Sequence, residues 1–388
     1  MTSGETRIEH DTMGEIRVPA DALWGASTAR AVQNFQISGR PLPHEVIVAL
    51  ATIKAAAAEA NRKIGVLDAD VADAIAKAAD EVAAGAHADQ FPIDRFQTGS
   101  GTSANMNVNE VIATLASRAS GLSIHPNDHV NASQSSNDTF PTALHLAIAQ
   151  LLRDQLIPDL QGLLDACAIK AREWADVVKT GRTHLMDAAP VTLGQEFDGY
   201  AGQVTTAIAR IESAVPRLLE VPLGGTAVGT GLNAPDDFTE RTLAAIEKRT
   251  AIKLTAPRSR FEAQSNRESL VEGSAAMRGL ALSLVKICND LRWMGSGPLT
   301  GLGEITLPAV QPGSSIMPGK VNPVIPEAVI QACCHVVGLD AAVAMGATTS
   351  VFQLNTAMPL MGSNTIEEVQ LLSACASALL RMIPSITT

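Results

Sequence analysis

Apolar residues recur every three or four positions along three long stretches of the chain. A mean step near 3.5 residues is typical of helices that pack together in a bundle. We therefore predict long helices in these stretches, the last running from about residue 262 to 295. The recurring positions are Leu144, Ile148, Leu151, Leu156, Leu160, Leu163 and Cys167, then Val204, Ile208, Ile211 and Val215, and finally Met277, Leu280, Leu284, Ile287, Leu291 and Met294.

Two shorter, Ala-rich helical patterns precede these stretches, at residues 44–64 and 68–86. Asp68 is suited to cap the second helix, because its side-chain oxygen can accept from free N–H groups of the first turn. Residues 1 to about 40 contain scattered glycines and Pro19, which predicts an irregular arm. The predicted fold is all-α, with an N-terminal arm and helical domain at residues 1–138 and a central long-helix bundle domain at residues 139–388.

Composition agrees with closely packed helices. Hydrophobic residues make up 46% of the 388 positions but aromatic residues only 3%, so the core must be built from Ala, Leu, Val and Ile. Long helices also carry more apolar surface than the few neighbours within one chain can cover. We therefore expect the chain to form an oligomer.

The net charge narrows the range of partners. A formal charge of -11, with no run of Lys or Arg, repels nucleic acid and anionic membrane surfaces. The five cysteines show no metal-ligand spacing and are expected to be reduced core residues of a cytoplasmic protein. We expect no secretory signal and no apolar run of membrane-spanning length.

One stretch concentrates polar chemistry: residues 311–323 read Gln-Pro-Gly-Ser-Ser-Ile-Met-Pro-Gly-Lys-Val-Asn-Pro. Its two glycines allow movement, while its prolines restrict the rest of the backbone. Lys320 is a positive charge near the hydroxyls of Ser314 and Ser315, which suits an anionic substrate entering from solvent. The stretch predicts a mobile lid, although its composition alone also fits an ordinary turn.

Four further polar clusters lie at expected helix starts, at residues 97–107, 125–138, 179–188 and 223–233. The helices that follow the second and third clusters are expected to begin near Pro141 and near Thr192. Hydroxyls, amides and glycines can bind a carboxylate through hydrogen bonds without adding charge. Each cluster by itself also fits an ordinary capped loop. The last is rich in glycine but lacks the lysine and the preceding strand of a nucleotide-binding loop.

The run from Gly313 to Pro323 resembles, without a gap, the signature of the fumarase/aspartase superfamily. Gly319 stands before the lysine as it does in class II fumarases, and residues 181–188 are similar to a second family motif at every position except Met186. The resemblance extends from about residue 7 to 380. It implies reversible hydration of fumarate to L-malate in the tricarboxylic acid cycle, by anti elimination through an aci-carboxylate intermediate.

The resemblance also implies an assembly. Family members are homotetramers in which the central helices form a common bundle and three subunits share each active site. The implied partners are the small dicarboxylates fumarate and L-malate, and neither a metal nor another cofactor is implied. The small C-terminal helical domain of the family is expected to be absent from this chain, which ends at Thr388.

The resemblance assigns catalytic roles. Ser314, activated by Lys320 and by N–H groups of its loop, would take the proton from C3, and His184, held by Glu327, would handle the departing hydroxyl. The alternative is that His184 takes the C3 proton through a water. The implied substrate ligands are Ser100, Gly101, Thr102, Ser135, Ser136, Asn137, Thr183, Ser315, Lys320, Val321 and Asn322. A second anion site is implied at His125, Pro126, Asn127 and Asp128, where Leu122 replaces an arginine that some members carry.

Two other functions fit parts of the sequence. An aspartase-type ammonia lyase is disfavoured by Gly319, where aspartases carry Ala, and by Ser136, where they tend to carry Thr. A catalytically silent helical scaffold of the same fold is disfavoured because Ser314, Lys320, His184 and Glu327 are all present.

Overall fold

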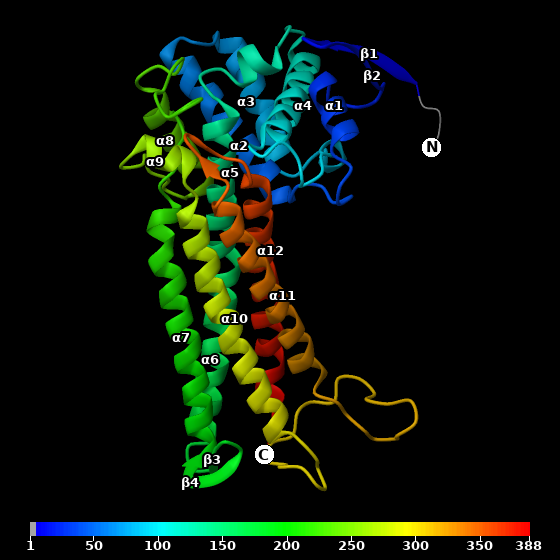
Figure 1. The fold of residues 1–388 in the computed structure, drawn as a ribbon, viewed down its shortest axis with the longest axis vertical. Coiled ribbons are helices and arrows are strands. Elements are labelled where there is room, and N and C mark those ends of the chain that lie inside the picture. Colours follow the sequence, from blue (N-terminus) through cyan, green and yellow to red (C-terminus); the bar gives the residue numbers. More distant parts are fainter. Residues whose placement is uncertain (1–4) are drawn as a thin grey trace. The chain divides into compact units, whose positions relative to one another are not determined.

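The computed structural model describes residues 5–388, which are mostly helical with three short antiparallel hairpins (Figure 1). The chain divides into two compact units. Unit 1 contains the chain up to Gln150 together with Pro216–Val271 and Ala342–Ile366, and unit 2 contains Leu151–Val215, Glu272–Ala341 and Glu367–Thr388. The domain division at residues 138 and 139 stays a prediction.

Unit 1 begins with a β-hairpin, so the prediction of an irregular arm was wrong. β1 (Thr6–Asp11) pairs with β2 (Gly14–Pro19) in antiparallel register. Exposed and half-buried residues alternate along β1, as expected for a strand with one covered face. The alternation extends over too few positions to stand out among scattered glycines.

The two Ala-rich helices of unit 1 are confirmed. α2 (His44–Ile64) has the predicted bounds. α3 (Ala69–Ala83) begins after Asp68 as predicted, but it ends three residues early and the side chain of Asp68 makes no capping hydrogen bond. Every residue from Ala49 to Ala60 except Glu59 is buried, because small side chains let neighbouring helices approach closely. The other elements are α1 (Ala26–Asn34), η1 (Ala88–Gln90), α4 (Thr102–Ser120), η2 (Pro126–Val130), α5 (Ser136–Leu151), α8 (Phe238–Thr250), α9 (Arg260–Ser265), β5 (Ser350–Val351) and β6 (Leu354–Asn355).

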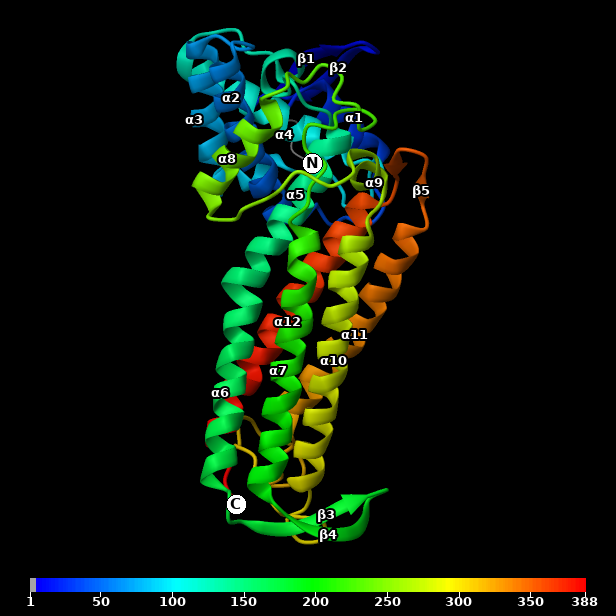
Figure 2. The same cartoon turned by 90° about the vertical axis from the view of Figure 1, so that its left-hand side faces the viewer.

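Unit 2 is a bundle of long helices that run side by side in both ribbon views (Figures 1 and 2). The predicted apolar stripe forms its core, since Leu280, Leu284, Ile287 and Leu291 are each 0% exposed. The bundle prediction is therefore confirmed. Its elements are η3 (Leu152–Leu156), α6 (Ile157–Glu173), β3 (Val178–Thr183), β4 (Met186–Thr192) and η4 (Ile383–Ser385), together with the larger part of each of α7 (Leu193–Leu218), α10 (Glu268–Met294), α11 (Val324–Ala347) and α12 (Met358–Met382).

Two helix boundaries differ from the predictions. The long helix expected from about residue 262 is interrupted, because Asn266 adopts an extended backbone between α9 and α10. α10 has 27 residues, which makes it about 40 Å long at 1.5 Å per residue. α5 begins at Ser136, five residues before the predicted start near Pro141.

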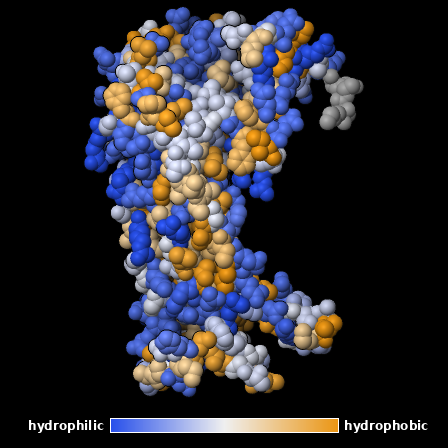
Figure 3. All heavy atoms as spheres, in the orientation of Figure 1, coloured by the Kyte–Doolittle hydropathy of each residue, from blue (hydrophilic) through white to orange (hydrophobic). Residues whose placement is uncertain are grey.

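α11 is the most apolar helix of the bundle. Its 24 residues are long and apolar enough to cross a membrane, by length and composition only, so the expectation that no such run exists was wrong. Only 33% of its most apolar window is buried within this chain, and Figure 3 shows hydrophobic side chains gathered around the position of α11. Cys334 on this helix is exposed, which corrects the expectation of five core cysteines, while the other four are buried.

Two carboxyl groups meet at one serine inside unit 2. Ser274 Oγ on α10 lies 2.9 Å from Asp340 Oδ1 on α11 and 2.9 Å from Glu368 Oε1 on α12, and all three residues are buried. One hydroxyl can donate only one proton, so one carboxyl group must carry a second. Arg278 forms an ion pair with Asp340, so the second proton is assigned to Glu368. Burial, together with the charge of Asp340, raises the pKa of Glu368 to about 8.

Glu368→Gln should stabilise the fold at alkaline pH. The pKa of Glu368 is about 8 in the folded chain and has its ordinary value of 4.5 in the unfolded chain. Between these two pH values the folded chain therefore binds more protons than the unfolded chain. Stability from this group is therefore lost as pH rises through that window. The glutamine amide has no proton to lose.

Urea denaturation at several pH values measures this effect. The gain in unfolding free energy of Glu368→Gln over the wild type should grow from about pH 5 to about pH 8. Glu247→Gln, the same change at an exposed helical position, serves as the control and should show no such trend. A pH-independent difference for Glu368→Gln would contradict the assignment of the proton.

Candidate active site

Three hydroxyls meet where the N-termini of α4 and α5 come together in unit 1. Thr102 Oγ1 lies 2.6 Å from Ser136 Oγ and 2.7 Å from Ser100 Oγ. Gly101 precedes α4 with φ at +73°, and a Cβ there would lie 2.2 Å from the ring of Phe140. Only glycine fits at that position, which lets the first turn of α4 approach α5.

The adjoining residues complete a polar surface. The backbone N–H of Asn137 donates to Ser135 Oγ at 3.2 Å, and Asn137 Nδ2 donates to the carbonyl of Ala227 at 2.9 Å. Helix N-termini carry partial positive charge and free N–H groups, so two of them beside several hydroxyls form a favourable site for a carboxylate. The structure thus brings together the six predicted ligands of this region: Ser100, Gly101, Thr102, Ser135, Ser136 and Asn137.

Asp138 ties this surface to the Gly-rich loop at residues 223–233. Its buried carboxylate accepts from the backbone N–H groups of Ser135 at 3.0 Å and of Gly224 and Thr226 at 2.9 Å each. Burial raises the pKa of Asp138, while these N–H groups act in the opposite direction. No role for Asp138 was predicted from the sequence.

The predicted second anion site forms a single π-helical turn at η2. His125 Nδ1 accepts from the backbone N–H of Asp128 at 3.1 Å and lies 3.3 Å from Asp128 Oδ2. Asn127 Nδ2 donates to Asp128 Oδ1 at 3.3 Å. The four predicted residues, including the half-buried Pro126, are adjacent in this turn, but its polar side chains largely bind one another.

In unit 2, the predicted lid is a loop closed by its own hydrogen bonds. The N–H of Gly313 donates to the carbonyl of Lys320 at 2.8 Å, and Asn322 Nδ2 donates to the carbonyl of Gly313 at 2.9 Å. Ser314 Oγ accepts from the backbone N–H groups of Ile316 and Met317, both at 3.2 Å. Such donors favour a negatively charged serine oxygen, which is what a serine acting as a base requires.

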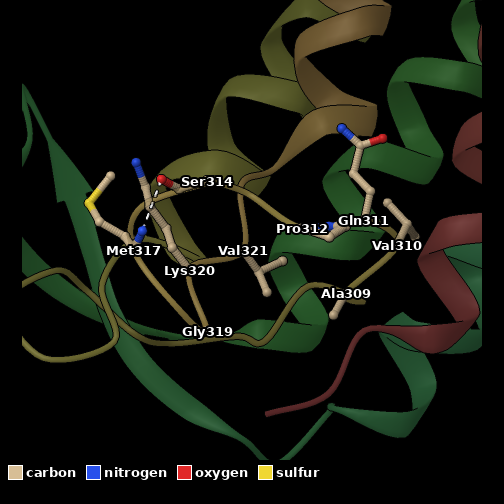
Figure 4. A pocket seen from close by; sticks show the side chains of 9 residues that line it. All are labelled: Ala309, Val310, Gln311, Pro312, Ser314, Met317, Gly319, Lys320 and Val321. Atoms are coloured by element: carbon tan, nitrogen blue, oxygen red, sulfur yellow. Dashed lines mark hydrogen bonds between the residues drawn. The ribbon is translucent and has the colours of Figure 1, made fainter.

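The loop surrounds a pocket of about 400 Å³ (Figure 4). Ser314, Lys320 and Val321 contribute to its lining, whereas Ser315 is exposed and is not part of it. The positive charge of Lys320 therefore faces the same space as the serine oxygen. The other lining residues are Ala309, Val310, Gln311, Pro312, Met317 and Gly319.

His184 lies at the tip of the hairpin formed by β3 and β4. It and Leu185 are the two residues between the paired Thr183 and Met186, and both have positive φ, at 55° and 58°. This is the backbone of a type I′ turn. His184 and Thr183 are exposed, and within residues 5–388 no hydrogen bond or ion pair connects His184 to Glu327 in the first turn of α11.

Ion pairs hold this hairpin in unit 2. Glu304 contacts Arg182 at 2.7 Å and Lys179 at 3.3 Å, and Lys179 also contacts Glu196 at 3.0 Å. Thr192 Oγ1 accepts from the N–H of Gln195 at 3.1 Å while Gln195 Oε1 accepts from the N–H of Thr192 at 2.9 Å. This reciprocal cap confirms the predicted helix start near Thr192.

Three residues that hold these segments in place were not predicted from the sequence: Asp138, Lys54 and Glu304. Lys54 lies inside α2, is 0% exposed, and contacts the segment that leads to Ser135. A single lysine within a run of alanines was the available signal, because a helix that buries all its faces rarely holds an unpartnered charge. Glu304 stands in an irregular segment and gave no such signal.

Comparison with known proteins identifies the family. A family model described as Lyase matches residues 14–338. The class II fumarate hydratase of Mycobacterium tuberculosis (strain ATCC 25618 / H37Rv) is 59% identical over 372 residues, which are 96% of this chain and 78% of that protein. The class II fumarate hydratase of Corynebacterium glutamicum is 57% identical over 374 residues, which are 96% of this chain and 79% of that protein. The chain belongs to the fumarase/aspartase family of lyases.

A solved structure of the same family agrees with the fold. The crystal structure of recombinant class II fumarase from Schistosoma mansoni matches with a TM-score of 0.97 at 37% sequence identity, and the match covers 99% of this chain and 85% of that chain. All five polar stretches fall inside the range that matches the lyase family. Both the cluster at the helix starts of unit 1 and the loop around Ser314 are therefore parts of the family match.

Gly313→Ala should open the loop more than Gly319→Ala. A Cβ at Gly313 would lie 2.4 Å from the carbonyl oxygen of Lys320, the acceptor that closes the loop. At Gly319 a Cβ meets nothing within 4 Å and only φ at +78° is unfavourable, at a cost of about 1–2 kcal/mol.

Limited trypsin digestion tests this comparison. Cleavage after Lys320, followed by mass spectrometry, should be several-fold faster in Gly313→Ala than in Gly319→Ala, while both variants melt near the wild-type temperature because the loop is largely exposed. Equal cleavage rates in the two variants would show that the hydrogen bond from Gly313 does not hold the loop closed.

Proposed function

We propose that this chain catalyses the reversible hydration of fumarate to L-malate, a step of the tricarboxylic acid cycle. The proposal depends on Ser314, whose side-chain oxygen accepts hydrogen bonds from two backbone N–H groups. The same loop places Lys320 in the lining of the pocket. Membership of a lyase family and identities of 59% and 57% to class II fumarate hydratases support the choice of substrate.

The first step is proton removal from C3 of malate. Ser314 Oγ takes the proton, and the electron pair moves into the neighbouring carboxylate to give an aci-carboxylate with two negative charges. Lys320 and Asn322 stabilise that charge, and preorganised donors of this kind are typically worth about 3–4 kcal/mol each in the transition state. Ser100, Thr102 and Ser136, at the starts of α4 and α5, bind a substrate carboxylate.

The second step releases the hydroxyl from C2. The electron pair returns to form the double bond, the C–O bond breaks, and His184 gives a proton to the leaving oxygen, so that fumarate and water are produced. Glu327 fixes the ring of His184 and stabilises its charged form. Thr183, Ser315 and Val321 are the remaining proposed substrate ligands, and the turn from His125 to Asp128 is the proposed second anion site.

We further propose a cytoplasmic homotetramer in which subunits share active sites. Two observations support it: only 33% of the most apolar window of α11 is buried within this chain, and within residues 5–388 no hydrogen bond or ion pair joins His184 to Glu327. A neighbouring copy would cover the exposed part of α11 and would supply the partner that His184 lacks within the described part of its own chain. Exposed apolar stripes of this kind are typical of subunit interfaces.

Assembly can be measured directly. The chain, purified without detergent, should elute as a stable tetramer by size-exclusion chromatography with light scattering at micromolar concentration. A stable monomer would refute the shared site, and protein that is recovered only with detergent would refute the proposed cytoplasmic location.

Substrate choice is tested by the ultraviolet absorbance of fumarate. The wild-type chain should form fumarate from L-malate and not from L-aspartate. Formation from aspartate instead would favour the ammonia lyase, and absence of both activities in the tetramer would favour a silent scaffold. Ser314→Ala is the matched control for background absorbance.

Ser314→Ala and Lys320→Ala should differ in kind. Removing a group used only in the transition state lowers kcat and kcat/KM together, so Ser314→Ala should lose turnover and keep most of its affinity. The charge of Lys320 serves the bound carboxylate and the aci-carboxylate alike, so Lys320→Ala should lose both. Steady-state kinetics with malate and a binding titration separate these outcomes. Retention of most kcat by Ser314→Ala would transfer proton removal to His184 acting through a water.

A further inference from the structure

Two polar residues of helix α2, Lys54 and Asn61, are completely buried among its alanines. Lys54 and Asn61 are each 0% exposed, and their spacing of seven residues places them on one face, two turns apart. Side chains that give up water in this way need specific partners, because an unsatisfied buried polar group is costly. The partners of both residues lie in one short segment of the chain, residues 131–134.

Lys54 holds the two ends of this segment. Its Nζ donates to Asn131 Oδ1 at 2.8 Å and to Gln134 Oε1 at 3.0 Å. Asn131 Oδ1 also accepts from Asn105 Nδ2 at 3.1 Å and from Asn109 Nδ2 at 3.2 Å, both on α4. The segment is therefore fixed between α2 and α4.

Asn61 holds the middle of the segment. Asn61 Nδ2 donates to the carbonyl of Ala132 at 3.0 Å, and Ser133 Oγ donates to Asn61 Oδ1 at 2.8 Å. Ser133 has φ at +65°, a left-handed conformation that residues other than glycine adopt only at a cost. Such a conformation persists where its surroundings determine it, and here the hydrogen bonds from α2 do so.

The segment leads directly to the hydroxyls at the start of α5. Ser135 and Ser136 follow Gln134 in the chain, and the backbone N–H of Ser135 donates a hydrogen bond to the carboxylate of Asp138. Lys54 also acts on Asp138 through its charge. Its hydrogen-bond partners are neutral amides, so its positive charge is not neutralised by them. Burial lowers the pKa of Lys54 to about 7, and the charge of Asp138 acts in the opposite direction.

We propose that Lys54, together with Asn61, is a positioning residue for substrate binding. Through their hydrogen bonds the two residues set the conformation of residues 131–134, and this conformation places Ser135, Ser136 and Asn137 at the substrate carboxylate. This inference rests on the proposed function, because those three residues are assigned to substrate there. Neither Lys54 nor Asn61 touches the substrate. Their effect appears in how well the dicarboxylate binds.

The test uses Lys54→Met, which keeps the length of the side chain and removes its charge and donors. Displaced ligands weaken substrate and transition state alike, which raises KM and leaves kcat nearly unchanged. We expect KM for malate to rise at least about tenfold, with kcat per active site within about threefold of the wild type. Lys63→Met, the same change at an exposed position of α2, should keep wild-type values.

Binding of succinate, a dicarboxylate without the hydroxyl that must leave, gives a readout independent of turnover. Calorimetric affinity for succinate should fall in Lys54→Met by the same factor as the rise in KM. A residue with a merely structural role would lower the melting temperature or the active fraction and leave both KM and succinate affinity unchanged. That result would overturn the inference while leaving the proposed function intact.

Asn61→Ala keeps the test decisive if Lys54→Met does not fold, because it removes the other half of the contact without leaving a buried charge unpaired. It should raise KM in the same direction by a smaller factor, and a folded Asn61→Ala with wild-type KM would refute the proposal. Failure of the wild type to convert malate or bind succinate would instead overturn the proposed function, and this inference with it.

Discussion

A single buried carboxylate connects the parts of the candidate carboxylate-binding surface in unit 1. Asp138 accepts N–H groups from Ser135 in its own segment and from Gly224 and Thr226 in a loop more than eighty residues away in sequence. A buried carboxylate with three such donors has a fixed position, because each lost bond would leave a buried group unsatisfied. The start of α5 and the Gly-rich loop therefore keep a fixed arrangement around the serine hydroxyls.

The periodic parts of the fold could be predicted because each helix repeats its pattern over several turns. The stripe from Leu280 to Leu291 is buried as expected, and α2 has the predicted bounds. The break at Asn266 and the hairpin from Thr6 to Pro19 could not be predicted in the same way. Both depend on a few residues whose local preference is weak and whose conformation is decided by packing.

The candidate site shows the same division. Runs of hydroxyls and glycines indicated the candidate ligands, although a run such as residues 97–107 also fits an ordinary capped loop and became informative only through the family resemblance. The residues that hold those runs in place were harder to find. Asp138, Lys54 and Glu304 act through partners that are distant in sequence, and a sequence does not state which distant residues meet. A charge inside an apolar helix is the one such signal that can be read in advance, as Lys54 illustrates.

The backbone conformation of the turn at His184 restricts which residue types are stable there. His184 and Leu185 both adopt a left-handed backbone conformation, which costs glycine and asparagine less energy than histidine or leucine. Local stability alone would therefore favour a different pair of residues at the hairpin tip. His184 nevertheless occupies this unfavourable position, at the tip of the β3–β4 hairpin. Glu304 holds the hairpin through ion pairs with Arg182 and Lys179. Because local stability does not account for a histidine at this position, the turn supports the role in catalysis that we propose for the ring.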